Sequence, residues 1–345
     1  MIIKIDNLTL EELQKQMTLI AEPSYKAKQI YEWIHQKNVT SFDEMSNIAK
    51  KTRELLKNSF EFTNISILQR LDSKQDETKK YLLLLEDGNI IETVFLKYKH
   101  GNTLCISSQV GCKMGCVFCA STKNGFVRNL SVAEILNQIY IVQKDSGEKI
   151  SNIVVMGTGE PLENFDNIIK FFNIINDEKG QNISLRKITI STCGLVPKIY
   201  ELANLDLQIT LAISLHVANQ EKREKILPIA RMYNLDDLKK ACEYYIKKTN
   251  KRITFEYILI DEFNDTYEDA VNLSNYTKNM LCNINLIPYN SIKESKISAS
   301  KENNIDKFRK TLTDLDLYAT VRRELGSDIN AACGQLRNDI LEKRM

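Results

Sequence analysis

The stretch Cys105–Cys119, which reads CISSQVGCKMGCVFC, is the part of the chain around which the rest is organised. Its last three cysteines, Cys112, Cys116 and Cys119, follow the spacing C-x3-C-x2-C, and Cys105 lies seven residues upstream of them. Three thiolates in so short a loop can bind one face of an iron–sulfur cluster. A cubane cluster held by only three cysteines leaves one iron open to a small molecule. The stretch therefore predicts a chemical centre built on iron and sulfur.

A structural zinc ion, with Cys105 as its fourth ligand, is the main alternative for these cysteines. Structural zinc sites favour paired C-x2-C knuckles, or cysteine and histidine sets with a second pair elsewhere in the chain. This sequence has no second pair, because its other cysteines are isolated and its histidines lie far from any C-x-x-C. The spacing therefore favours a cluster over zinc.

The composition is typical of a globular protein of the soluble class. The 345 residues are 43% hydrophobic and 27% charged, and no segment approaches the length of a membrane span. The N-terminus, MIIKIDNLTLEELQKQM, has early acidic residues and no long apolar run, so we expect no secretory signal and a cytoplasmic location. The net charge of +2 is by itself no signature of nucleic-acid binding, because a polyanionic partner usually selects a strong basic excess.

Beyond residue 98 the chain alternates between strand-like and helix-like runs, which predicts parallel strands joined by helical crossovers. The strand-like runs are 103–109, 152–157, 187–193, 209–216, 253–260, 283–288 and 318–323. The helix-like runs are 131–145, 165–177, 197–204, 234–248, 266–279 and 301–315. About seven strands are too few for a closed eightfold barrel. We therefore expect an α/β fold with an open, partial parallel β/α barrel over residues 99–345, and functional groups at the carboxyl ends of its strands.

Two smaller units precede the barrel. Residues 1–60 have helical periodicity and predict a small N-terminal helical domain. The expected helix caps are Thr9 with Glu12, Ser24, and Ser41 with Glu44. Residues 61–98 predict a β-hairpin linker, because Asp87-Gly88-Asn89 separates two β-rich runs. The hairpin ends beside the cysteine stretch, so Glu92 in its second strand either reaches the chemistry or faces solvent.

The cysteine motif, with the aromatic residue Phe118 before its last cysteine, resembles the signature of radical S-adenosylmethionine (SAM) enzymes. The fold implied by this resemblance is a partial α/β barrel. It also implies that Cys112, Cys116 and Cys119 hold a [4Fe-4S] cluster whose open iron binds the amino and carboxylate groups of SAM. One-electron reduction of SAM at such a cluster releases a 5′-deoxyadenosyl radical.

Nearly the whole chain resembles the bacterial adenine-C2 RNA methyltransferases, which modify 23S rRNA and certain tRNAs. The similar stretches are EPSYKAKQIYEWI, IIETVFL, TLCISSQVGCKMGCVFCAS, NGFVRNL, GTGEPLEN, ISTCG, AISLH, NLIPYN and GSDINAACGQL. Thr158 departs from the pattern, which has methionine between the two glycines. The resemblance implies action on the peptidyl transferase centre of 23S rRNA and on tRNA, with an electron donor such as a flavodoxin. We expect a monomer without a membrane partner, and RNA contact by the N-terminal unit through its basic face Lys50–Lys57.

The resemblance also implies how C2 is methylated. Adenine C2 is electron-poor and cannot attack a SAM methyl group directly, so two SAM molecules are used per turnover. One methylates the thiolate matched by Cys333, and the other supplies the radical that abstracts hydrogen from this S-methyl group. The carbon radical adds to C2, and the cysteine matched by Cys105 then attacks the Cys333 sulfur, forming a disulfide and freeing the methylated base. Glu92 matches the residue proposed to accept the C2 proton.

The residues matched to SAM contacts follow strands, where ligands of such barrels are held. They are Gly159, Glu160, Ser191, Ser214, Leu215, His216 and Asn290. The remaining cysteines, Cys193, Cys242 and Cys282, are assigned to core packing. A helix start near Asp328 and the pair Arg322-Arg323 are expected to favour the Cys333 thiolate.

Several other protein classes can be weighed against this one. A methylthiotransferase would need a second cysteine triad, a cobalamin-dependent radical methylase would need an added domain, and the sequence holds neither. The sister family that methylates adenine C8 of the same rRNA is more similar. It has alanine and cysteine where this chain has Pro161 and Val110, so the resemblance favours C2. A zinc-stapled RNA-binding protein is the alternative from a different class.

Overall fold

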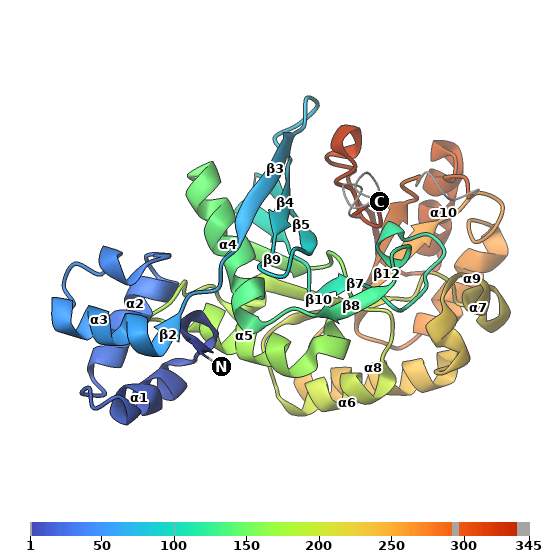
Figure 1. Ribbon diagram of the computed structural model, residues 1–345. Helices are drawn as coiled ribbons and strands as arrows, with labels where there is room; N and C mark the ends of the chain where they lie inside the picture. Colours follow the sequence, from blue (N-terminus) through green and yellow to red (C-terminus); the bar gives the residue numbers. More distant parts are fainter. Residues whose placement is uncertain (1, 100, 292–296, 337–345) are drawn as a thin grey trace.

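A ten-stranded sheet forms the centre of the molecule, in the order β14-β13-β12-β11-β10-β9-β6-β5-β4-β3 (Figure 1). The computed structural model describes residues 2–99, 101–291 and 297–336. The strands from β14 to β6 in this order are parallel to one another. They are β6 (Gly101–Cys105), β9 (Asn152–Val155), β10 (Ile188–Thr192), β11 (Thr210–Ser214), β12 (Ile253–Leu259), β13 (Cys282–Pro288) and β14 (Ala319–Val321). Because β14 and β3 are both edges, the barrel is open, as predicted.

Helices connect the parallel strands and cover one face of the sheet (Figure 1). They are α4 (Val132–Ser146), α5 (Phe165–Asn176), α6 (Val196–Asn204), α7 (Gln220–Ile226), α8 (Leu235–Thr249), α9 (Tyr267–Thr277) and α10 (Glu302–Asp314). Helix α4 begins at a capping box of Ser131 with Glu134 and ends at Gly147 in the left-handed conformation, φ 69°. All of these helices except α7 were predicted. The α/β fold with a partial parallel barrel is thus confirmed.

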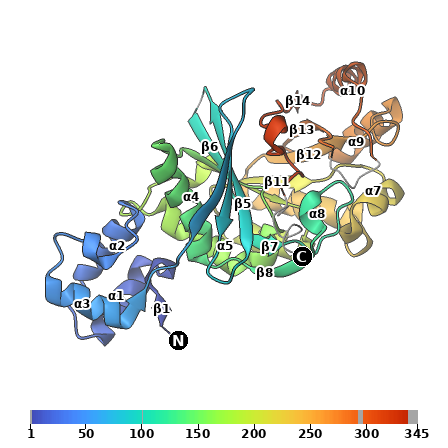
Figure 2. The ribbon, with the colours of Figure 1, turned by 45° about the horizontal axis from the view of Figure 1, so that its top comes forward.

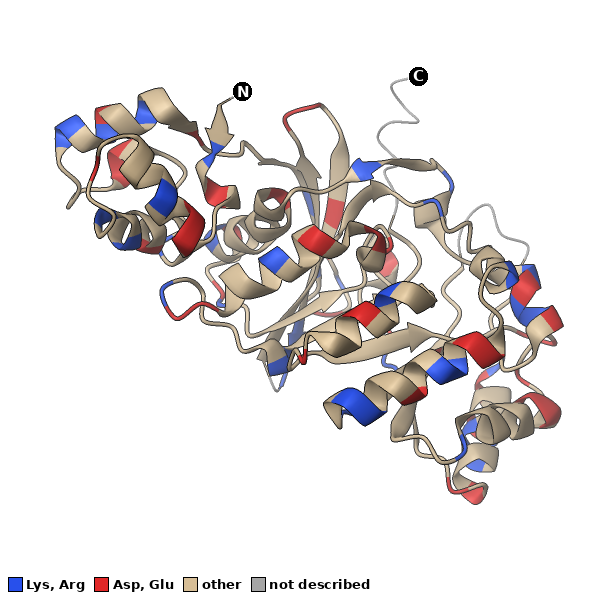
Figure 3. Cartoon of the chain, turned by 90° about the horizontal axis from the view of Figure 1, so that it is seen from below, with Lys and Arg blue, Asp and Glu red and all other residues tan. Residues whose placement is uncertain are grey.

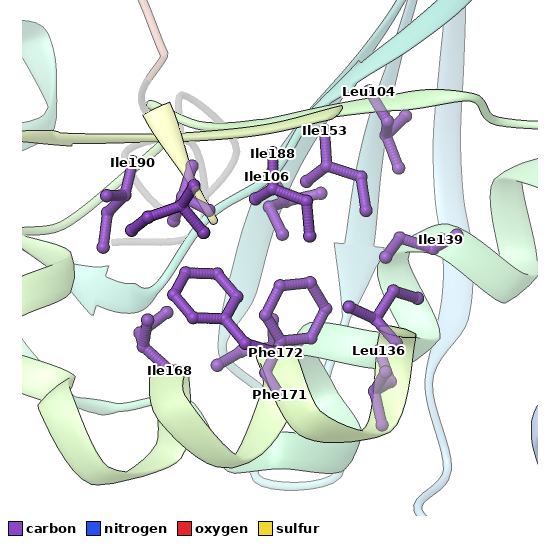
Figure 4. Close-up of a cluster of buried hydrophobic side chains, with 14 of the residues drawn as sticks. Leu104, Ile106, Leu136, Ile139, Ile153, Ile168, Phe171, Phe172, Ile188 and Ile190 are labelled. Atoms are coloured by element: carbon purple, nitrogen blue, oxygen red, sulfur yellow. The ribbon is translucent and has the colours of Figure 1, made fainter. Parts of the chain in front are cut away.

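The main core lies between this helical layer and the sheet (Figure 4). Phe171 and Phe172 on α5 are fully buried, with ring centroids 5.7 Å apart, and face the sheet. Side chains along β9 and β10 alternate between the two faces of the sheet. The buried ones that pack against these rings are Ile153 on β9 and Ile188 and Ile190 on β10. This packing fixes the sheet whose strand ends carry the site.

Three antiparallel strands continue the same sheet beyond β6 (Figure 2). They are β3 (Ser66–Asp72), β4 (Lys79–Leu84) and β5 (Ile90–Tyr98). The predicted hairpin turn is confirmed: Leu85 N donates to Asn89 O at 2.8 Å, and Gly88 has φ +81°. The segment expected as a linker is therefore part of the central sheet. The division of the chain into domains after residues 60 and 98 stays a prediction.

The N-terminal helices α1 (Leu10–Leu19), α2 (Lys26–His35) and α3 (Lys50–Ser59) pack beside α4 at one end of the molecule (Figure 1). Strands β1 (Ile3–Lys4) and β2 (Phe60–Glu61) pair and close this unit. The capping boxes at Thr9 and Ser41 are confirmed, the second at a 3₁₀ turn. Ser24 is not the cap of α2, because Tyr25 precedes that helix in helical conformation without a side-chain cap.

The outer helices carry interspersed positive and negative side chains (Figure 3). No helix in the described ranges has the length and hydrophobicity that a membrane span needs.

His35 joins the N-terminal unit to the barrel from a fully buried position. Its Nδ1 lies 2.9 Å from the Tyr140 hydroxyl on α4, and its carbonyl accepts from Gln181 Nε2 at 2.7 Å. Burial lowers the pKa of His35 to about 3. Native His35 therefore stays neutral where a histidine of the unfolded chain, with a pKa of about 6.5, takes up a proton.

We predict that this histidine makes the protein less stable as the pH is lowered. As pH drops below about 6.5 the unfolded chain binds the extra proton, so the free energy of unfolding decreases by up to about 1.4 kcal/mol per pH unit until the pH nears the native value. Urea denaturation at pH 7.5 and 5.5 should show about 1.4 kcal/mol more loss in the wild type than in His35→Phe. An equal loss in both proteins would contradict the prediction.

Candidate active site

A cavity of about 900 Å³, open solvent included, lies at the carboxyl ends of the parallel strands. The cysteine loop, the ends of β9, β10 and β11, and the C-terminal segment contribute to its wall. Of the residues singled out in the sequence, it is lined by Cys112, Cys116, Cys119, Gly159, Glu160, Ser191, Ser214, His216 and Cys333. Side chains predicted from separate strand ends are thus brought together at one place.

The cysteine loop is held at its base by a small ribbon. Strands β7 (Gln109–Gly111) and β8 (Phe126–Asn129) pair antiparallel, and Cys112 N donates to Gly125 O at 2.9 Å. Gly111 has φ +71°, and a Cβ there would lie 1.9 Å from Gly125 O, so only glycine fits. Further along, Val117 N donates to Ile226 O on α7 at 3.1 Å. The loop is therefore fixed at both its base and its tip.

Cys112 is buried, Cys116 and Cys119 are half-buried, and the three thiols are close enough to affect one another. Burial raises the pKa of Cys112 to about 12, and burial together with the charges of neighbouring cysteines raises the pKa of Cys116 and Cys119. Thiols in this state bind a metal only when it displaces their protons. The described residues include no group of three or more histidine, cysteine or acidic side chains arranged to hold a single metal ion. Three soft sulfur donors on one cavity wall fit iron of a cluster.

Glu160 presents a fixed carboxylate to this cavity. Its two oxygens accept from Leu162 N at 3.0 Å and Cys193 N at 2.8 Å, and its own N–H donates to Gln109 Oε1 at 2.8 Å. Burial raises its pKa, although these backbone hydrogen bonds oppose the rise. Gly159 before it has φ +110°, and a Cβ there would lie 2.6 Å from Gln109 Cβ. A carboxylate held this way is suited to a cationic group such as an ammonium.

Polar groups at the ends of β10 and β11 line the same cavity as Glu160. The hydroxyls of Ser191 and Ser214 lie 3.4 Å apart. His216 has a left-handed backbone, φ +59°, and its Nδ1 accepts from Ile258 N at 3.1 Å. Burial and the nearby Arg223 lower its pKa to about 3, so the ring is neutral and Nε2 carries its proton. Leu215 does not line the cavity; its side chain is fully buried in the core.

A second cavity adjoins the first and contains the two remaining predicted cysteines. Cys105 at the end of β6 and Cys333 both line it, and Cys333 lines the first cavity as well. Cys105 thus lines a different cavity from Cys112, Cys116 and Cys119. Burial raises the pKa of Cys105 to about 12, with Cys333 adding to the rise and Arg322 opposing it. Asn290 lies on this side, donating to Cys333 O at 3.1 Å.

The segment Gly326–Leu336 brings Cys333 to this junction and is bound on two sides. Ala120 N donates to Gly334 O and Ser121 Oγ donates to Leu336 O, both at 2.7 Å. On the other side the Asp328 carboxylate accepts from Ser73 Oγ at 2.7 Å and Lys74 N at 2.8 Å, in the turn between β3 and β4. A helix does begin near Asp328, but it is a single 3₁₀ turn, Ser327–Ile329, without a side-chain cap, and Asp328 anchors the segment.

Known proteins are similar in sequence to nearly the whole of this chain. A family model described as "Radical SAM superfamily" matches residues 106–274, and one described as "Ribosomal RNA large subunit methyltransferase N-terminal domain" matches residues 3–62. A probable dual-specificity RNA methyltransferase RlmN of Lachnoclostridium phytofermentans is 51% identical over 99% of this chain and 96% of its own length. The one of Clostridium novyi is 52% identical over 97% and 98%. The chain belongs to the RlmN family of radical SAM RNA methyltransferases.

A solved structure supports the same family. The crystal structure of a radical SAM methyltransferase from Sphaerobacter thermophilus has a TM-score of 0.93 and 37% identity, and the match covers 97% of this chain and 99% of that one. Membership of the radical SAM superfamily implies a [4Fe-4S] cluster and SAM as cofactors.

Within this RlmN-family chain, Glu92 has a position that the sequence left open. It is buried, so the solvent-facing alternative is wrong, and it forms an ion pair of 2.7 Å with the buried Lys80. Glu92 lines neither cavity. It does share a face of the sheet with Cys105, because Val94, two residues along β5, is directly opposite Cys105 in the ladder.

Sequence reasoning missed several residues of the site. Glu256 on β12 lines the first cavity as a buried carboxylate, 2.7 Å from Asn285 Nδ2. Its signal was an acidic residue within the apolar run ITFEYIL. Cys193, assigned to core packing, is buried but also lines the first cavity. Cys242 is fully buried as expected, and Cys282 is partly buried against the core.

We predict that Gly159→Ala weakens SAM binding by at least about tenfold, because the added Cβ displaces Gln109 and with it the Glu160 carboxylate. SAM affinity of the cluster-loaded protein, measured by equilibrium dialysis, checks it. Gly88→Ala is the matched control: Gly88 also has a positive φ, but nothing lies within 4 Å of its Cβ position. SAM affinity that is unchanged in Gly159→Ala, or reduced equally in both variants, would refute the role given to Gly159.

Proposed function

We propose that this enzyme methylates C2 of adenine in 23S rRNA, at the peptidyl transferase centre, and in tRNA. The observation that carries the proposal is the position of Cys333, which lines both the cavity of Cys112, Cys116 and Cys119 and the cavity of Cys105. One thiol is thereby within reach of a methyl donor on one side and of a second thiol on the other. The relatives' name, dual-specificity RNA methyltransferase, supports two RNA substrates.

The cofactor set is proposed from the first cavity. Cys112, Cys116 and Cys119 would be the three protein ligands of the cluster, and Glu160 with the polar groups of Ser191, Ser214 and His216 would hold SAM. When bound, the cluster and two SAM molecules per turnover supply the methyl carbon, a one-electron route that makes this carbon reactive, and a sink for the electron left on the adduct. The remaining steps belong to side chains of this chain.

Cys333 is the methyl acceptor in this scheme. Its thiolate sulfur would gain a bond to the methyl carbon of SAM as the bond from that carbon to the sulfonium sulfur breaks and S-adenosylhomocysteine leaves. The same carbon, after losing one hydrogen atom, would gain a bond to adenine C2. The RNA is then covalently attached to the Cys333 sulfur. Arg322 lines both cavities, and its pKa is raised chiefly by Cys333, so a positive charge lies near the sulfur that takes part in this step. Asn290 holds the backbone carbonyl of Cys333.

Release requires one proton transfer and one sulfur exchange. Glu92 accepts the proton from C2, and the electron pair of the C2–H bond stays with the purine. Cys105, as thiolate, then attacks the Cys333 sulfur, which breaks its bond to the methylene carbon, and this carbon takes up a proton to become the methyl group. The disulfide that remains must be reduced by an external thiol before the next turnover. Burial raises the pKa of Cys105, so its thiol must lose a proton before it can attack. The positive charge of Arg322 favours that loss.

C2 is favoured over C8 by two residues that lie next to site residues in the sequence. Val110 is buried in β7 just before the cysteine loop, and Pro161 follows the Glu160 carboxylate at the start of a 3₁₀ turn. Each differs from the residue of the C8-methylating sister family. We also propose a one-electron donor of the flavodoxin type, a monomeric enzyme, and RNA contact through the basic face Lys50–Lys57 of α3.

The test is mass spectrometry of RNA. The chain is reconstituted anaerobically with iron and sulfide, incubated with SAM, a reductant and unmodified 23S rRNA or tRNA, and the RNA is digested to nucleosides. The proposal expects a brown, iron-containing protein and 2-methyladenosine from both RNAs. Finding 8-methyladenosine would assign the sister activity, and a colourless zinc protein without methylated product would support an RNA-binding protein.

We predict that Cys105→Ala traps the covalent protein–RNA adduct, because no thiol remains to cleave the Cys333 sulfur–carbon bond, whereas Cys333→Ala gives neither adduct nor product. Denaturing gels with labelled RNA measure both. Cys282→Ala is the control, since Cys282 lines neither cavity, and it should retain wild-type turnover. Free methylated RNA from Cys105→Ala would exclude its resolving role, and product from Cys333→Ala would exclude methyl transfer through that thiol.

A further inference from the structure

Lys80 is a buried cation that belongs to neither cavity and has no role in the scheme above. It lies on β4, within the run KKYLLL, and only 5% of its surface is exposed. Taking an ammonium group out of water costs several kcal/mol unless it is paired and hydrogen-bonded. Lys80 makes an ion pair with Glu92 and a hydrogen bond to the carbonyl of Asn330.

The first contact is with the proposed proton acceptor. Lys80 Nζ lies 2.7 Å from Glu92 Oε1, and both side chains are almost completely buried. In the ladder between β4 and β5, Leu82 is opposite Glu92 and Lys80 is opposite Val94. The ion pair is thus a diagonal cross-strand pair on the face of the sheet that carries Cys105.

The second contact is with the segment that carries the methyl acceptor. The same Nζ donates to Asn330 O at 3.1 Å, three residues before Cys333. Around this bond, Ala331 N donates to Gly326 O at 2.9 Å, and Ala331 and Leu336 pack on Val94 and Cys105. One ammonium group therefore joins Glu92 to the backbone that positions Cys333.

We propose that Lys80 is a positioning residue that keeps Glu92 ionised and aligned with the Cys333 segment, so that Glu92 can take the C2 proton from the adduct. This inference rests on the proposed function. A carboxylate buried without a nearby cation takes up a proton and cannot accept another. When the C2–H bond breaks, its electron pair stays with the purine and the proton moves to Glu92, which becomes neutral. Lys80 is then a buried cation without its counter-charge, and loss of the proton from Glu92 restores the pair.

The consequence is specific to one stage of the reaction. Methyl transfer from SAM to Cys333 needs no proton acceptor at C2, whereas resolution of the adduct does. Replacing Lys80 with a neutral residue should leave the first stage intact and stop the second. Loss of a simple structural support would instead reduce both stages together.

The experiment compares Lys80→Met, Lys80→Gln and Lys80→Arg with Lys79→Met as the matched control. Lys79 is the neighbour of Lys80 on the opposite face of β4, where it forms a half-exposed ion pair of 3.1 Å with Asp72. Intact-protein mass spectrometry measures S-methylation of Cys333, denaturing gels measure the protein–RNA adduct, and nucleoside analysis measures product. Lys80→Gln keeps a hydrogen-bond donor without the charge, in case Lys80→Met does not fold.

We expect Lys80→Met and Lys80→Gln to methylate Cys333 as the wild type does, to accumulate adduct, and to form product at least about 100-fold more slowly. Lys80→Arg should recover product formation to within about tenfold of the wild type, and Lys79→Met should equal it. Normal product formation by either neutral variant, or adduct levels no higher than in the wild type, would overturn the role of Lys80. If Cys105→Ala also fails to trap an adduct, the proposed function itself is wrong, and the two failures are thereby told apart.

Discussion

Two hydrogen bonds between the cysteine loop and the C-terminal segment, Ala120 N to Gly334 O and Ser121 Oγ to Leu336 O, are the contacts on which the site depends. They join parts of the chain that are more than 200 residues apart. They hold Cys333 beside the three-cysteine wall, while Asn290 and Lys80 bind the same segment from other sides. Because both acceptors are backbone carbonyls, the contact fixes the path of the chain and not only one side chain.

The sheet makes this junction possible by offering two kinds of surface. Its parallel strands end at one edge, where Glu160, Ser191 and Ser214 meet the cysteine loop. Its antiparallel strands β4 and β5 stand beside β6 and present a face of buried side chains to the C-terminal segment (Figure 2). Strand β5 lines the second cavity through Leu96 and Tyr98, and the C-terminal segment contacts the Lys80–Glu92 pair through Asn330 O.

The fold could largely be predicted from the sequence, because each barrel strand is a short apolar run and most helices show apolar periodicity. The exception is α7, whose sequence QEKREKI has a single apolar residue. It is stabilised by tertiary contacts: Arg223, fully buried, donates to the carbonyls of Leu215 and Cys193 at the strand ends. Such contacts join distant residues and leave no local pattern.

The site was predictable where residue type alone indicated chemistry, and not where orientation decided. Cysteine spacing marked Cys112, Cys116 and Cys119, but only strand register shows that Lys80 faces inward while Lys79 faces outward. Likewise Ser214 and His216 line the cavity while Leu215 between them turns into the core. Asn290, expected beside SAM, binds the Cys333 carbonyl. The resemblance matched whole stretches of sequence, and it could not show which side chains within a stretch face the cavity.

The C-terminal segment also sets the order in which the enzyme can become active during its synthesis. Ribosomes make the chain from its N-terminus, and earlier portions begin to fold first. All the strands and the cysteine loop precede Gly326–Leu336, so a nascent chain can build its sheet while Cys333 has not yet been added. At that stage the carbonyl of Asn330, to which Lys80 donates in the complete chain, is also missing. The contacts that Lys80 and the cysteine loop make with this segment therefore form only after the other elements of the fold have been synthesised.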